Sequence, residues 1–247
     1  MVLLVGSGAT IAQIGAQSWI FLILSGLATG ASWLCYFRAL QIGPASKVSV
    51  VDRSSIVLTV LFAILLLGET DDLVARLAGI ALIAAGTYLM IDRRRGVTGA
   101  GTTAATGPWL VYAAASAVFA ALTAILGKVG ITDVESNLGT AIRTVVVLIM
   151  AWIVVAVSRE KAALRRIPRR ELVFIALSGL ATAASWLCFW RAMQEGPASV
   201  VVPIDKLSVV VTVALAAVFF RERQSPRALL GLGLIVVGTL IMVVAAG

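Results

Sequence analysis

Long apolar runs separated by short polar segments make up nearly the whole chain. Most of these runs are close to the roughly 20 residues that an α-helix needs to cross the hydrocarbon core of a bilayer. The pattern predicts an all-α fold, a polytopic membrane helix bundle of about 8 transmembrane helices. The expected spans are residues 19–41, 48–67, 74–91, 109–130, 138–157, 171–193, 199–220 and 227–246.

The chain contains an internal duplication. Residues 25–39 read S-G-L-A-T-G-A-S-W-L-C-Y-F-R-A, and residues 178–192 read S-G-L-A-T-A-A-S-W-L-C-F-W-R-A. Self-similarity of this kind is the sequence signature of a repeated structural unit. We expect three parts: an incomplete first repeat over 1–91 with three helices and the remnant of another, a linker over 92–107, and a complete five-helix second repeat over 108–247.

Composition restricts the class of protein. Hydrophobic residues make up 60% of the chain, charged residues 13%, and the mean hydropathy is +1.04. These values lie outside the range of soluble domains, so we expect an integral membrane protein without a soluble catalytic domain. The sequence has no histidine, no C-x-x-C and no phosphate-binding loop. It therefore supports neither an enzyme nor a cofactor or metal site.

The distribution of charge predicts the orientation of the repeats. The basic residues that give the net charge of +8 gather in the linker, in residues 159–170 and in residues 221–227. With eight spans these three segments fall on one face of the membrane, and the positive-inside rule predicts that this face is cytoplasmic. Because the basic residues are explained as cytoplasmic loop charges, nucleic acid is not an expected partner. The segment that matches 159–170, residues 6–18, carries no charge. Matching loops that differ in this way are expected to lie on opposite sides of the membrane, so the two copies point in opposite directions. Inverted repeats of this kind are an architecture of transporters.

Several motifs resemble one transporter family. They are G-L-A-T-x-x-S-W-L-C-x-x-R-A, G-P-A-S, V-P-I-D-K-L-S-V-V and G-T-L-I-M. The chain from Trp19 onward resembles the EamA-type branch of the drug/metabolite transporter superfamily. The resemblance implies two inverted five-helix repeats that move small metabolites, often outward. It does not select among amino acids, nucleotide sugars, drugs and lipid-linked sugars. The first repeat departs from the family by lacking two helices.

Asp205 and Lys206 are charged residues near the start of a predicted span, just after Pro203. They are either a polar site in a central cavity or an interfacial pair, since a charge that faces lipid costs several kcal/mol. Pro203 has no N–H, and we expect it to leave Asp205 among unpaired backbone donors at the helix start. Adjacent residues point about 100° apart on a helix, so each should need its own partner.

Other candidates lie in the matching and neighbouring helices. Arg191 is expected to attract an anionic group, to neutralise Asp205 across the bundle, or to pair with Glu195 four residues later. Arg143 is either a cavity charge or a snorkelling anchor. Trp186 and Trp190 lie four residues apart and either line a substrate path or anchor the helix. The counterparts in the first repeat complete the candidate set: Asp52, Arg53 and Arg38.

Small residues spaced four apart occur in both repeats, at Gly26 and Gly30 and at Gly179 and Ala183. This spacing lets membrane helices approach closely, and we expect both pairs to pack inside the bundle.

The sequence thus predicts a secondary transporter, an exporter or exchanger of a small metabolite that works by alternating access. The alternative is a non-transporting membrane scaffold or an inactive truncated remnant. We expect an integral protein of the plasma (inner) membrane of a prokaryote. Its partners would be the lipid bilayer and an unidentified small-molecule substrate, and assembly as a homodimer stays open.

Overall fold

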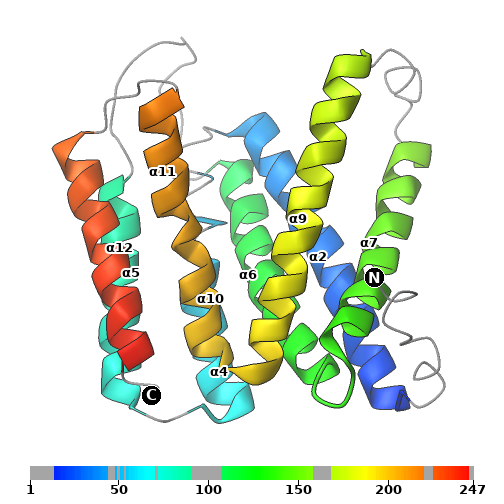
Figure 1. Cartoon of the computed structure of the whole chain (residues 1–247), viewed down its shortest axis with the longest axis horizontal. Coiled ribbons are helices and arrows are strands. Elements are labelled where there is room, and N and C mark those ends of the chain that lie inside the picture. The colour runs from blue at the N-terminus through cyan, green and yellow to red at the C-terminus, as the bar shows by residue number, and fades with distance from the viewer. Residues whose placement is uncertain are drawn as a thin grey trace. The chain divides into compact units, whose positions relative to one another are not determined.

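A computed structural model describes residues 14–43, 48, 51–52, 54–69, 72–90, 107–157, 168–219 and 225–244. The regular structure within these ranges is helical, as Figure 1 shows, which confirms the expected fold class. The elements are α2 (Ala16–Ile42), α4 (Ser55–Leu67), α5 (Leu73–Met90), α6 (Pro108–Gly130), α7 (Ser136–Val157), α9 (Arg169–Glu195), α10 (Ala198–Lys206), α11 (Ser208–Phe219) and α12 (Pro226–Val244).

Five of these helices are long and apolar enough to cross a membrane: α2, α6, α7, α9 and α12. Two further apolar helices, α4 and α5, are shorter. Arg53 and nearly all of the predicted linker lie outside the described residues.

The span expected over residues 199–220 is not one continuous helix. It breaks at Leu207, between α10 and α11. The backbone N–H of Leu207 bonds to the carbonyl of Ile204, 2.9 Å away, a bond one residue shorter than in an α-helix. Pro203 lies inside α10, where its missing N–H removes a helical hydrogen bond. The predicted span is therefore a broken helix with Asp205 near the break.

Helix packing divides the chain differently from the duplication. One compact unit comprises Met1–Gly30 and Thr123–Gly196, and the second comprises Ala31–Leu122 and Pro197–Gly247. We call them unit 1 and unit 2. Each unit contains segments of both repeats, and helices α2 and α6 each contribute to both units. The repeats are units of duplication, and the compact units combine parts of each.

In unit 2, the last helices of the two repeats, α5 and α12, lie side by side (Figure 1). A Cβ added at Gly79 would lie 2.8 Å from the carbonyl oxygen of Gly238, and one added at Gly86 would overlap the carbonyl oxygen of Gly231. The two backbones therefore approach closely and run antiparallel. Gly79 matches Gly231 in the duplication and Gly86 matches Gly238, so the two contacts are equivalent by symmetry. This self-complementary pairing is what two inverted repeats require.

In unit 1, α2 packs on α7 through the small residues singled out in the sequence. A Cβ added at Gly26 would lie 2.8 Å from Cβ of Val146, and one at Gly30 would lie 2.5 Å from the sulfur of Met150. This confirms the first of the two expected contacts. The second is wrong for the described residues, because no atom lies within 4 Å of a Cβ added at Gly179. Matching motifs in the two repeats therefore have different neighbours.

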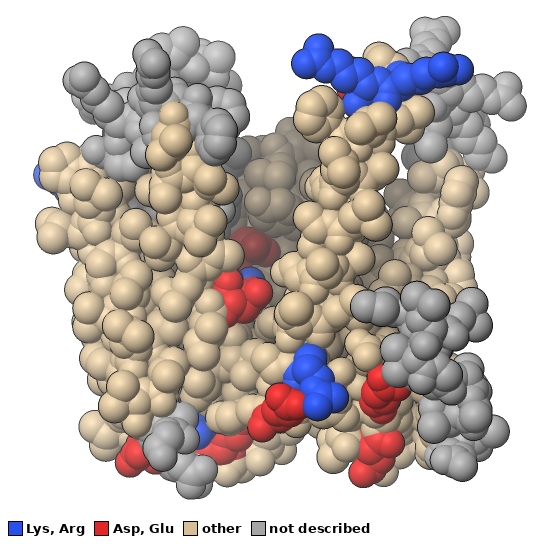
Figure 2. Space-filling view, in the orientation of Figure 1, with Lys and Arg blue, Asp and Glu red and all other residues tan. Residues whose placement is uncertain are grey.

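Charges in unit 1 separate along helix α9. Arg169 and Arg170 lie at its start, where Figure 2 shows a group of basic side chains. Arg191 and Glu195 lie at its other end, and acidic side chains gather there in the same view. The described part of unit 1 thus carries the charge asymmetry on which the predicted orientation rests.

Candidate functional site

Arg143 is the most deeply buried charged side chain among the sequence-predicted candidates. It lies in the second turn of α7 and is 1% exposed. Its Nε donates to Oγ of Ser25 at 2.8 Å, and its Nη2 donates to Oγ1 of Thr29 at 3.3 Å. Both hydroxyls belong to α2. The side chain therefore points into unit 1, and the snorkelling alternative does not describe it.

Two tryptophans of α9 complete the surroundings of Arg143. The guanidinium carbon lies 3.7 Å from the ring centroid of Trp190 and 5.8 Å from that of Trp186. Trp190 is 2% exposed, whereas Trp186 is half-buried. A cation over the face of an indole ring is attracted by the negative charge density of that face. The structure thus brings together three of the predicted candidates, Arg143, Trp186 and Trp190. We call these residues, with Ser25 and Thr29, the arginine cluster.

Helix α6 supports the arginine cluster from a further side. Gly127 has no side chain, and a Cβ there would overlap the ring of Trp190. Thr123, one turn earlier, accepts a 2.7 Å hydrogen bond from Oγ of Ser25 through its carbonyl oxygen. The absence of a side chain at Gly127 allows the Trp190 ring to lie beside α6. Four helices, α2, α6, α7 and α9, therefore hold one cation.

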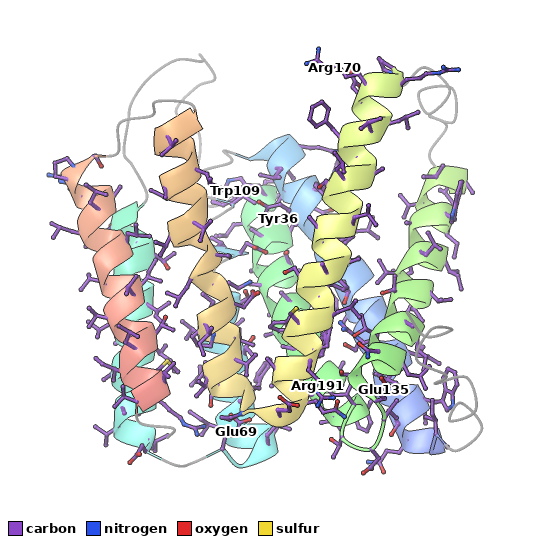
Figure 3. All side chains as sticks on the ribbon, viewed as in Figure 1. Tyr36, Glu69, Trp109, Glu135, Arg170 and Arg191 are labelled. Atoms are coloured by element: carbon purple, nitrogen blue, oxygen red, sulfur yellow. The ribbon has the colours of Figure 1, made fainter. Side chains whose placement is uncertain are left out.

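The end of α9, at the bottom of Figure 3, is joined by polar contacts to the end of α6 and to the connection between α6 and α7. Nε2 of Gln194 donates to the carbonyl oxygens of Ile131 and Val134 at 3.1 and 2.9 Å. Nζ of Lys128 donates to the carbonyl oxygens of Met193 and Gly196. These contacts satisfy carbonyls at the end of α9 and hold the connection between α6 and α7 against it.

Unit 2 contains a second buried arginine, and this one is paired. Nη1 of Arg76 lies 3.3 Å from Oε2 of Glu69, 2.8 Å from the Glu69 carbonyl oxygen and 2.6 Å from Oγ of Ser199. The Glu69 carboxylate also accepts from the backbone N–H groups of Ala198 and Ser199 at 2.8 and 3.0 Å. It thereby caps α10, whose preceding residue Pro197 makes no side-chain cap.

This cap corrects one sequence expectation. Asp205 was expected among unpaired donors at a helix start, but it is the eighth residue of α10, and Glu69 occupies the donors at that start. Asp205 and Lys206 were also expected to need separate partners. Instead, Nζ of Lys206 lies 3.5 Å from Oδ2 of Asp205. The four-carbon stem of Lys206 can turn back because α10 ends at this residue.

Asp52 lies in a hydroxyl network of unit 2. Its Oδ1 accepts a 2.9 Å hydrogen bond from Oγ of Ser116 on α6. Oγ of Ser116 also lies 3.3 Å from Oγ of Ser32 on α2. The Asp52 side chain is half-buried, and no ion pair joins it to a Lys or Arg of the described ranges. Asp52 is therefore a carboxylate held by a neutral donor.

The remaining candidates are exposed and locally paired. Nε of Arg191 donates to Oε1 of Glu195 at 2.6 Å, and both side chains are 61% exposed. The structure therefore shows the i, i+4 pair that was one of the three expected alternatives for Arg191, which Figure 3 labels at the lower end of α9. Nη1 of Arg38 donates to Oε1 of Gln41 at 3.1 Å. Neither arginine belongs to the arginine cluster.

Sequence reasoning did not identify Glu69 and Arg76, or the hydroxyls of Ser25 and Thr29, as functional or structural groups. A signal for the first pair was present, because G-P-A-S begins a helix without a good side-chain cap and so needs an acceptor from elsewhere. A signal for the hydroxyls was the spacing of Ser25 and Thr29, which places them on one helix face with Gly26 and Gly30 nearby. Their partner could not be read from the sequence.

Comparison with known proteins identifies the family. The model of the EamA-like transporter family matches residues 1–92 and 107–244. An uncharacterized transporter encoded in the cobO 3' region of Sinorhizobium sp is 42% identical over 136 residues, which is 55% of this chain and 96% of that relative. The uncharacterized protein MJ1333.1 of Methanocaldococcus jannaschii is 27% identical over 74 residues, 30% of this chain and 54% of that protein.

A solved structure described as "Crystal structure of protein" has a TM-score of 0.73 and 20% sequence identity, and the match covers 98% of this chain and 83% of that one. At this identity the likeness shows the fold alone. The family match extends over both repeats, and it confirms the resemblance drawn from the repeated motifs. The protein is an integral membrane transporter rather than an enzyme, and it belongs to the EamA-like transporter family.

Proposed function

We propose that the protein is a secondary transporter that exports or exchanges a small metabolite by alternating access of its two inverted repeats. The observation that carries the proposal is the antiparallel pairing of α5 with α12, in which Gly79 lies against Gly238 and Gly86 lies against Gly231. Equivalent helices that pair in opposite directions can exchange roles, so that a site facing one side in one state faces the other side in the next.

The described chain supports gradient-driven rather than ATP-driven transport. The sequence has no phosphate-binding loop. Coupling would use either a proton on a carboxylate, for which Asp52 and Asp205 are the candidates, or the return of a second substrate molecule. The host membrane we propose is the plasma membrane of a prokaryote, and the relative from Sinorhizobium is consistent with this.

The test is transport by the purified full chain in liposomes loaded with an isotope-labelled bacterial metabolite extract. Mass spectrometry of the external medium would identify a compound that leaves protein-containing liposomes faster than protein-free ones. Acceleration by an external pool of the same compound would indicate exchange, and acceleration by an imposed proton gradient would indicate proton coupling. If folded protein releases no compound above the protein-free rate, the non-transporting scaffold becomes the better description.

A further inference from the structure

Arg143 has more donors than the structure satisfies. A guanidinium carries five N–H groups. Two of them are used, one from Nε to Ser25 and one from Nη2 to Thr29, so three remain. Nη1 in particular is buried and has no hydrogen-bond partner. A buried donor without a partner costs the full free energy of removing it from water, and the cost is larger for a charged group.

The groups that do contact Arg143 bring no negative charge. Oγ of Ser25 donates its own proton to the carbonyl oxygen of Thr123, and Oγ1 of Thr29 donates to the carbonyl oxygen of Ser25. Both hydroxyls therefore offer Arg143 only a neutral lone pair. In the described part of the chain no carboxylate lies within ion-pair distance of the guanidinium. The charge is shielded by Trp190 but is not neutralised.

Arg76, a second buried arginine in the described ranges, shows how this chain neutralises a structural charge. Arg76 is 2% exposed, as deeply placed as Arg143 at 1%. Its Nη1 contacts the Glu69 carboxylate, the Glu69 carbonyl and the Ser199 hydroxyl together. If Arg143 had a purely structural role, we would expect a carboxylate beside it as well, since an unpaired charge inside a membrane protein is costly. The difference points to a counter-charge that the described residues do not supply and that a bound anion can provide.

We propose that Arg143 binds the anionic group of the transported substrate, so that the substrate class is small organic anions with a carboxylate or a phosphate. The three remaining N–H groups suit an oxyanion, which a guanidinium binds with paired, charge-assisted hydrogen bonds. Trp190 closes one face of the guanidinium and half-buried Trp186 lies beside it, so an aromatic or apolar portion of the substrate would rest on α9. This inference rests on the proposed transport function.

The test measures binding directly, without flux. The full chain is placed in nanodiscs of phosphatidylcholine and titrated with benzoate, with phenyl phosphate and with neutral benzamide. Intrinsic tryptophan fluorescence reports on all six tryptophans, of which Trp186 and Trp190 contact Arg143. The thermal unfolding midpoint provides an independent signal. We expect benzoate or phenyl phosphate, but not benzamide, to change the fluorescence with saturation and to raise the unfolding temperature. Equal responses to benzoate and benzamide would overturn the proposal.

Variants separate recognition from folding. Arg143→Lys keeps the charge but loses the planar fork, and should weaken anion binding about tenfold or more, as expected from the loss of one charge-assisted hydrogen bond. Arg143→Met removes the charge and should abolish the response. The Met variant should still fold, because the protons of Ser25 and Thr29 stay bonded to backbone carbonyls. Arg170→Gln, at the start of α9, is the matched control and should bind like the wild type.

The phosphate of a lipid headgroup shares the chemistry of a free anion, so one arm repeats the titration in nanodiscs containing phosphatidylglycerol. Unchanged benzoate affinity supports a substrate site. An affinity lost in phosphatidylglycerol, together with an Arg143-dependent preference for that lipid, would overturn substrate recognition in favour of a lipid site. Anion binding without flux would leave the site intact and contradict the proposed transport. Transport that is equally fast in the wild type and in the Arg143 variants would contradict the proposed site but not the proposed transport function.

Discussion

Oε2 of Glu69, in the first repeat, accepts two hydrogen bonds from Ser199 of the second repeat. The backbone N–H of Ser199 donates at 3.0 Å and its hydroxyl donates at 2.6 Å. The contact joins the loop after α4 to the start of α10 within unit 2. Because Arg76 lies against the same oxygen, the carboxylate neutralises a buried cation and caps a helix at once.

Glu69→Ala should therefore destabilise the protein strongly. The substitution leaves the charge of Arg76 buried and unpaired and frees two N–H donors, and breaking a buried pair in this way costs about 3 kcal/mol or more. Unfolding of the detergent-solubilised protein by heat or by added SDS would measure the loss. Glu195→Ala is the control, since it breaks an exposed ion pair worth about 1 kcal/mol or less. Similar losses from both variants would contradict the assignment of Glu69 as a buried cap.

The two small-residue motifs should respond oppositely to added side chains. In Gly26→Ala the new Cβ would lie 2.8 Å from Cβ of Val146, so α2 and α7 must move apart and stability should fall. In Gly179→Ala nothing lies within 4 Å, and stability should rise by about 0.5–1 kcal/mol because alanine favours the helix. The same unfolding assay compares them. A loss from Gly179→Ala would show that this face of α9 is covered in the assembled protein.

Of the two matching carboxylates, we expect Asp52 to carry any proton coupling. The sequence placed Asp205 among unpaired donors at a helix start, but Glu69 accepts from the backbone donors at the start of α10. Both carboxylates are of intermediate burial, but Asp205 is paired with the Lys206 cation, whereas Asp52 accepts a hydrogen bond from the neutral hydroxyl of Ser116. Asp52→Asn should abolish the response of transport to a proton gradient, and Asp205→Asn should retain it. The opposite ranking in liposome flux would return the role to Asp205.

The distribution of arginines predicts the topology. A reporter inserted near Gly101, beside the arginines of the linker, should be cytoplasmic, and one fused after Gly247 should lie outside. In unit 1, α9 runs from the basic end at Arg169 to the exposed pair of Arg191 and Glu195, in agreement with a cytoplasmic start. Paired alkaline phosphatase and green fluorescent protein fusions would read both positions. A cytoplasmic C-terminus would show that another determinant overrides these charges.

Helix positions were predictable from this sequence because the bilayer sets a length for each span and hydropathy reports it directly. The observed bounds of α2, Ala16–Ile42, extend the expected 19–41 by three residues at the start and one at the end. The break at Leu207 was not predicted, although Pro203 indicated it. Proline weakens a helix over several residues, and tertiary contacts decide where the axis changes.

Partners between distant helices were not predictable. The burial of Arg143 depends on which helix presents Ser25 and Thr29 to it, residues that lie 118 and 114 positions away. Repeat symmetry holds for Arg191 and Arg38, which match in the duplication and are both exposed with a local partner. It gives no information on Arg143, which has no counterpart in the described first repeat. Hydropathy reports only how much of a helix is apolar. It carries no information on the neighbour that its polar positions meet.

The interleaving of the two repeats in each compact unit limits how the chain can be divided. A cut in the linker would yield one fragment holding α2, α4 and α5 and another holding α6 to α12, and neither would contain a whole unit. The first fragment alone should expose the faces of Gly26 and Gly79, and the second should expose the surfaces of α7 and α12 that pack on them. Cellular proteases should remove either fragment when it is made alone. Expressed together, the two fragments should accumulate and copurify, so that the abundance of one half depends on the other.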